Sequence, residues 1–277
     1  MTKTLLRLGA PAAVLLVLMA AAGCGSGTAP SPSASASKTA APVRAPAPPP
    51  APKNAACYRL TMKQEVAPTS SAAATPCSRT HTSETYFVGQ LDTQVDGHLV
   101  AVDSDRVGAQ VASTCRDRLD SFLGGSADDA RLSMVHPVWF TPSVGQSDKG
   151  ANWFRCDAVV TAGGNLTSRT QSLKGAMKSS KSRDGLSMCG TDAPDAKDFH
   201  RVPCAAHHSW RAIAVVPLKK GAYPGVKAAK SAGQTTCQNA AAHAAADPLS
   251  YQWGYEYPTK KDWDMDQQYG ICWTKGS

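Results

Sequence analysis

The sequence has few aromatic residues, and its N-terminal part has no acidic ones. Phe, Trp and Tyr make up 6% of the 277 residues, and alanine supplies much of the apolar fraction, so we expect a thin apolar core. Residues 1–54 contain five Lys or Arg and no Asp or Glu. The remaining 24 basic and 21 acidic residues are nearly balanced. This balance argues against a nucleic-acid partner, because a nucleic-acid-binding protein needs a basic face.

The sequence also lacks the short motifs that mark several classes of enzyme. It has no Cys-x-x-Cys pair, no His-Glu-x-x-His metal motif, no Gly-x-Ser-x-Gly nucleophile turn and no glycine-rich phosphate loop. We therefore predict that the protein is not an enzyme and that it has no cofactor and no bound metal.

The N-terminal residues have the pattern of an export signal. Lys3 and Arg7 precede an apolar stretch, 11–22, that is too short to span a membrane stably and ends in small residues. We expect residues 1–23 to be a signal peptide. The sequence Ala-Ala-Gly-Cys at 21–24 resembles a bacterial lipobox, and the resemblance implies that Cys24 is diacylated and becomes the mature N-terminus. Ordinary signal-peptidase cleavage is the alternative.

Residues 24–54 have the composition of a flexible tether. They are almost entirely Ala, Pro, Ser, Gly and Thr, which cannot bury enough apolar surface to fold. A polyproline-like chain of this length reaches at most about 90 Å. With a lipid at Cys24, the tether predicts a protein on the extracytoplasmic face of the plasma membrane, with release from the membrane as the alternative.

The other eight cysteines reveal an internal repeat. Pro76-Cys77 followed by His81 parallels Pro203-Cys204 followed by His208, and a proline lies 14 residues before the last cysteine of each set of four. An even number of cysteines in an exported chain predicts disulfides. Four cysteines per repeat allow three pairings, and chain order favours pairing of neighbours. The expected pairs are Cys57–Cys77, Cys115–Cys156, Cys189–Cys204 and Cys237–Cys272.

Hydrophobic periodicity predicts an α+β fold of two tandem, disulfide-stapled β-α-β-β modules. The expected modules are 55–162 and 186–277, joined by a linker at 163–185. Helices are expected at 107–123 and 226–244. Strands are expected at 84–91, 132–140, 153–160, 211–216, 251–257 and 269–273.

A few polar and aromatic residues are candidates for binding. His81 and His208 each follow a cysteine by four residues, so they are candidates for turn-stabilising residues, ligand-binding residues or zinc ligands. Glu84 lies close enough to His81 in sequence to form an acid–base pair. Trp253, Tyr255 and Tyr257 alternate along one strand, which suits either a core face or a binding face.

Several segments resemble the septum-formation domain of envelope proteins from high-GC Gram-positive bacteria. They are 166–175, 202–208, 221–225 and 255–272. The resemblance implies an envelope protein connected with division and carries over no catalytic residues. We expect a non-catalytic binding or scaffolding lipoprotein acting in septum formation or wall assembly, with a cell-wall polymer or division proteins as partners. The alternatives are a wall-directed hydrolase that uses His81 or His208, and a purely structural lipoprotein.

Overall fold

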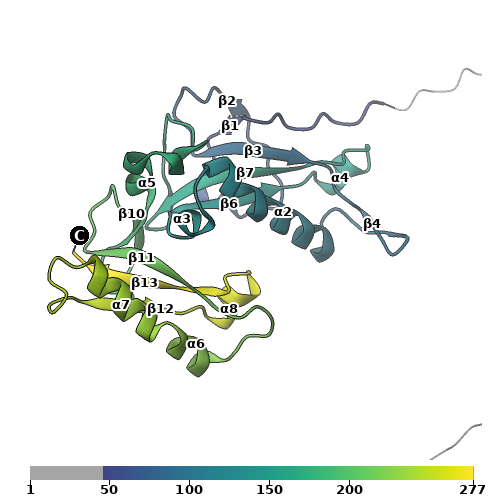
Figure 1. Cartoon of the computed structure of the whole chain (residues 1–277). Coiled ribbons are helices and arrows are strands. Elements are labelled where there is room, and N and C mark those ends of the chain that lie inside the picture. Colours follow the sequence, from purple (N-terminus) through teal and green to yellow (C-terminus); the bar gives the residue numbers. More distant parts are fainter. Residues whose placement is uncertain (1–45, 277) are drawn as a thin grey trace, which may run out of the picture. The chain divides into compact units, whose positions relative to one another are not determined.

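The structure, a computed structural model, describes residues 46–276, which contain two antiparallel β-sheets and a small hairpin (Figure 1). The expected signal peptide, the expected lipid site at Cys24 and most of the tether lie outside the described residues. Residues 46–54 form no helix or strand and are mostly exposed. Within the described range, none of the helices has the length and hydrophobicity that a bilayer-crossing segment needs.

The first sheet has the strand order β2–β1–β3–β7–β6, and β8 pairs with the end of β7. Its strands are β1 (Cys57–Tyr58), β2 (Ala74–Thr75), β3 (Ser83–Gly89), β6 (Val135–Phe140), β7 (Phe154–Ala162) and β8 (Asn165–Leu166). Strands β4 (Gln94–Val95) and β5 (His98–Leu99) form the separate hairpin. The central strand β7 is buried along most of its length, since β3 and β6 lie on both sides of it and α2 packs on one face.

Helix α2 (Asp105–Leu123) covers one face of the first sheet, close to where the sequence predicts a helix. The hydroxyl of Ser104 accepts a hydrogen bond from the Val107 amide and caps the start of the helix. Gly124 ends it in the left-handed conformation, with φ of 74°, which glycine adopts without strain. The short helices beside this sheet are α1 (Met62–Glu65), α3 (Ala127–Arg131) and α4 (Val144–Ser147).

The second sheet has the order β10–β9–β11–β13–β12. Its strands are β9 (Met188–Gly190), β10 (Arg201–Pro203), β11 (Trp210–Pro217), β12 (Trp253–Glu256) and β13 (Tyr269–Lys275). The single helix expected at 226–244 is two helices, α6 (Val226–Ala232) and α7 (Gln234–Ala244). The break falls at Gly233, where a Cβ atom would lie 2.2 Å from Cε2 of Tyr255, so the aromatic ring packs directly on the helix backbone. Helix α8 (Lys260–Asp264) follows β12.

Residues 163–185, expected to be a linker, contribute to the fold. They include β8, η1 (Ala176–Lys178) and most of α5 (Ser180–Leu186), and the side chains of Leu173 and Met177 are fully buried. These two residues belong to a core cluster that also contains Leu123 from α2 and Trp273 from β13. The described residues 46–276 accordingly lie within one compact unit. The α+β class is confirmed, whereas the division into two modules stays a prediction.

Four disulfides join the cysteine pairs that chain order favours: Cys57–Cys77, Cys115–Cys156, Cys189–Cys204 and Cys237–Cys272. In each half, one bridge ties a helix to the sheet: Cys115–Cys156 joins α2 to β7, and Cys237–Cys272 joins α7 to β13. All four of these cysteines have no exposed surface, so these two bridges lie inside the core.

Candidate functional site

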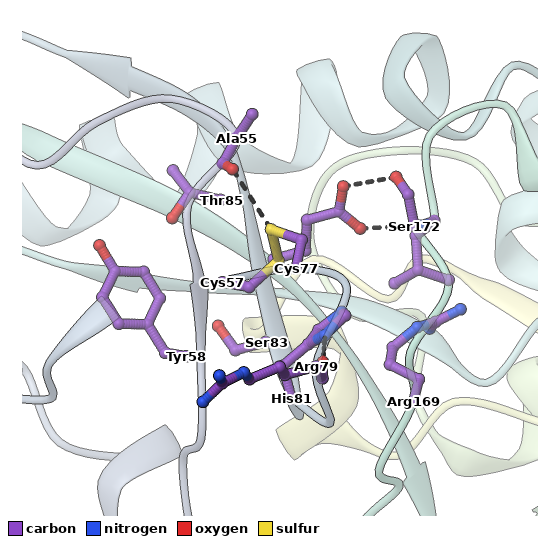
Figure 2. Close-up of a disulfide and its surroundings, with 12 residues drawn as sticks. Ala55, Cys57, Tyr58, Cys77, Arg79, His81, Ser83, Thr85, Arg169 and Ser172 are labelled. Carbon is purple, nitrogen blue, oxygen red and sulfur yellow. Dashed lines mark hydrogen bonds between the residues drawn. A yellow bond between two sulfur atoms is a disulfide. The ribbon is translucent and has the colours of Figure 1, made fainter. Parts of the chain in front are cut away.

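His81 lies in the turn that leads from the Cys57–Cys77 bridge into β3 (Figure 2). The imidazole is fully buried, and its Nδ1 lies 2.8 Å from the carbonyl oxygen of Arg79. The backbones of His81 and Arg169 form a two-way pair, each amide donating to the other's carbonyl at 2.9 Å. This backbone pairing joins the turn to the 163–185 segment.

Glu84 is held by the same segment rather than by His81. Its carboxylate accepts a hydrogen bond from the Ser172 hydroxyl at 2.5 Å and another from the Leu173 amide at 2.7 Å. Both oxygens are therefore occupied, and no hydrogen bond joins Glu84 to His81 among the described residues. Burial lowers the pKa of the nearby Arg169, an effect that the Glu84 carboxylate opposes. The acid–base pair considered for these two residues is not formed.

Replacing Glu84 with alanine is expected to lower the free energy of unfolding by about 2 kcal/mol, because a buried carboxylate that accepts two hydrogen bonds is lost. Urea unfolding measures the loss, and amide hydrogen exchange at Leu173 should become faster. Ser172→Ala is the control: it removes one donor and should cost about 1 kcal/mol. Unchanged exchange at Leu173 in the Glu84 variant would contradict the anchoring role.

His208 repeats the local geometry of His81, with its Nδ1 2.8 Å from the carbonyl oxygen of Ala206. Arg211, which stands where the first half has Glu84, pairs with Asp184 at 2.9 Å. The Cys189 and Cys204 sulfurs and a ring nitrogen of His208 lie within 4.8 Å of one another. Because the two sulfurs are bonded to each other, this cluster offers no thiolate to a zinc ion.

Trp253 and Tyr255 on β12 pack against a core cluster that includes Cys237 of α7. The Tyr255 ring lies over the backbones of Gly233 and Gly270, where a Cβ atom would come within 2.4 Å of it. Burial raises the pKa of Tyr255 to about 12. The Tyr257 ring, 6.4 Å from that of Tyr255, is half-buried beside it. Trp253 and Tyr255 are thus core-facing residues at the edge of the second sheet.

The described residues enclose a cleft of about 790 Å³. Residues of α2, α3 and β6 line it, together with β10, β13 and the segment after α8. Its lining includes four cationic and four acidic side chains: Arg116, Arg131, Arg201 and Lys220, and Glu65, Asp117, Asp120 and Asp266. None of the residues proposed from the sequence lies in this lining, since the cleft is formed by segments far apart in the chain.

Two of the arginines that line the cleft form ion pairs with carboxylates. Arg116 lies 3.5 Å from Asp266, and Arg201 lies 2.7 Å from Glu256 just beyond the lining. Burial raises the pKa of Asp120, while the charge of Arg131 opposes this shift. The guanidinium of Arg131 also lies 5.0 Å from the ring centre of Tyr269, whose pKa is raised by burial.

Glu65 and His136 form a polar pair at the cleft wall. Glu65 ends α1, which begins at the capping residue Thr61, and its side chain is only 8% exposed. One carboxylate oxygen lies 2.7 Å from Nε2 of His136 on β6, and the other has no hydrogen-bond partner among the described residues. The Thr61-x-x-Gln64 capping box indicates where α1 begins. The sequence does not indicate the pair itself, because 71 positions separate Glu65 and His136.

Comparison with known proteins identifies one family. A family model described as "Septum formation" matches residues 54–277, almost all of the described chain. No curated protein and no solved structure matches the sequence.

Proposed function

The chain belongs to the septum-formation family, and from that premise we propose that it is a non-catalytic binding or scaffolding protein of the cell envelope. It holds a partner in the cleft between the two halves of its fold, and the partner is a cell-wall polymer or a division protein. The cleft of about 790 Å³ is the observation that carries this proposal, since its volume lies in the range of about 300–1,000 Å³ that is usual for ligand sites.

The absence of an assembled acid–base pair at the candidate histidines supports a binding role. His81 and His208 each place Nδ1 on a backbone carbonyl, and both oxygens of Glu84 are already bonded. A general base must reach the proton that it removes, and the fully buried His81 has no exposed surface from which to do so. We therefore propose binding rather than wall hydrolysis through His81 or His208.

The proposed location is the extracytoplasmic face of the plasma membrane. Four disulfides within one chain are typical of exported proteins, because the cytosol keeps thiols reduced. In the proposal, a lipid on Cys24 holds the chain at the membrane and the Ala/Pro-rich tether lets the folded part reach towards the wall.

The test fills the cleft without disturbing the core. Asp117 on α2 and Met265 after α8 are exposed and line the cleft. The double variant Asp117→Trp/Met265→Trp should fold normally and retrieve at least about tenfold less wall or division partner from crosslinked envelopes, a loss of about 1.4 kcal/mol in binding. Leu249→Trp is the control for size and hydrophobicity, because Leu249 is 94% exposed and lies outside the lining.

Equal retrieval by the filled and control variants would overturn the proposal. A purely structural lipoprotein predicts that result, because its function would not depend on an open cleft. Thermal unfolding of both variants, with midpoints near that of the unaltered chain, establishes that any loss of retrieval comes from the cleft and not from unfolding.

A further inference from the structure

Methionine is concentrated in the cleft. Residues 46–276 contain five methionines, and four of them line it. They come from α1, from the residue before β6, from β9 and from the segment after α8: Met62, Met134, Met188 and Met265. Met134 and Met188 are buried, Met62 is half-buried and Met265 is 56% exposed. Met134 and Met188 belong to the core cluster that contains Trp273, so Met62 and Met265 are the methionines accessible in the cleft.

Such a lining suits an apolar side chain of variable shape. Methionine is unbranched and polarisable, so a group of methionines can adapt to leucine, methionine or an aromatic ring. Surfaces that bind many polypeptide segments use methionine in this way, and methionine and arginine are enriched in protein interfaces. The cleft is lined by both residue types.

The charges of the cleft disfavour a polyanion such as an acidic wall polymer or a lipid headgroup. The lining has as many acidic as cationic side chains, and Arg116 and Arg201 already have carboxylate partners. No ion pair in the described part of the chain involves Asp117, Asp120 or Lys220. The cleft thus offers carboxylates on α2 to a cationic group and an ammonium to an anionic one.

A neutral glycan is disfavoured for a different reason. Sugar rings are usually held by stacking on exposed aromatic side chains, and Tyr269 is the one aromatic residue lining the cleft in the described chain. Its ring faces the guanidinium of Arg131, and the residue is only partly exposed. The aromatic residues of β12 instead pack towards α7.

We infer that the cleft binds a polypeptide segment of a partner protein, whose apolar side chain contacts methionine that is accessible in the cleft and whose flanking residues carry charges of both signs. This inference rests on the proposed function and names the class of its ligand. The acidic residues of α2 receive a lysine or arginine of the segment, and Lys220 receives an aspartate or glutamate.

The experiment places a photo-crosslinking residue, p-benzoylphenylalanine, at Met265 in the full chain in the cells that produce it. The same residue at Leu249 is the control. We expect a discrete adduct at Met265 only, degraded by protease, with the crosslink within a segment that has an apolar residue flanked by both charge signs. A synthetic peptide of that segment should bind the purified full chain at least tenfold more weakly after Asp117→Lys, and equally after Leu249→Lys.

The other outcomes separate the two proposals. An adduct specific to Met265 that resists protease and is degraded by glycosidase, or that contains lipid, overturns the peptide inference but leaves a binding cleft. No adduct at Met265 above the Leu249 control overturns both. A peptide whose affinity is unchanged by Asp117→Lys overturns the assigned charge contacts and with them the inference.

Discussion

Removing the Cys115–Cys156 bridge by replacing both cysteines with alanine is expected to lower the free energy of unfolding by about 4 kcal/mol. The two residues are 41 positions apart, and in the chain-entropy model a longer closed loop gives more stabilisation. The bridge also holds α2 against β7 from within the core. Urea unfolding of the oxidised variant and of the unaltered protein measures the difference.

The Cys57–Cys77 bridge is the matched comparison. It spans 20 residues, and Cys77 is only half-buried, so alanine at both positions should cost about 3 kcal/mol. The dependence on these bridges follows from a core that contains few aromatic residues and much alanine. If both variants unfolded at the same urea concentration as the unaltered protein, the fold would not depend on its bridges.

The elements that the sequence predicts well are those whose signals are local. The stripe of Val107, Val111, Cys115 and Leu119, the cap at Ser104 and the stop at Gly124 together define α2 within two residues. The break between α6 and α7 is not predictable in the same way. It falls at Gly233, where the ring of Tyr255, 22 positions further along the chain, packs onto the helix backbone.

The cleft could not be predicted for the same physical reason. Glu65 and His136 meet across 71 positions, and the partner of Glu84 at Ser172 lies 88 positions away. Sequence spacing predicts a contact between His81 and Glu84, whereas in the folded chain Glu84 contacts Ser172 and Leu173. The Ser- and Lys-rich composition of 163–185 predicts an exposed linker, but Leu173 and Met177 in this segment are buried and pack in the core.

Replacing Asp157 with alanine is expected to lower the free energy of unfolding by about 3–5 kcal/mol, since it leaves a buried cation without its partner. Asp157 has no exposed surface, and one of its carboxylate oxygens lies 3.2 Å from the Arg155 guanidinium. That guanidinium lies 3.7 Å from the ring centre of Tyr58 and 4.6 Å from that of Phe140, so it cannot move into water without exposing them. Urea unfolding at neutral pH measures the loss.

The control removes the polar cluster as a whole. The hydroxyls of Ser83 and Thr85 donate to Asp157 at 2.7 and 2.6 Å, so they also need replacement. The variant Ser83→Ala/Thr85→Val/Arg155→Met/Asp157→Leu has no unpaired charge and should unfold within about 1 kcal/mol of the unaltered protein. A loss as large as that of Asp157→Ala would show that packing, and not charge, causes the effect.

The single variant Arg155→Met tests the same pair through pH. Burial already raises the pKa of Asp157 despite the opposing charge of Arg155 and the two hydroxyl donors, and removing the arginine raises that pKa further. A carboxyl whose pKa is higher in the folded than in the unfolded state binds its proton more tightly in the folded state. Its contribution to the free energy of unfolding is therefore complete below the unfolded pKa and is lost as pH rises through the folded pKa. The destabilisation by Arg155→Met should therefore grow as pH rises above the folded pKa of Asp157 in the unaltered protein, whereas that by Asp157→Ala, which leaves no carboxyl to titrate, should not follow this trend.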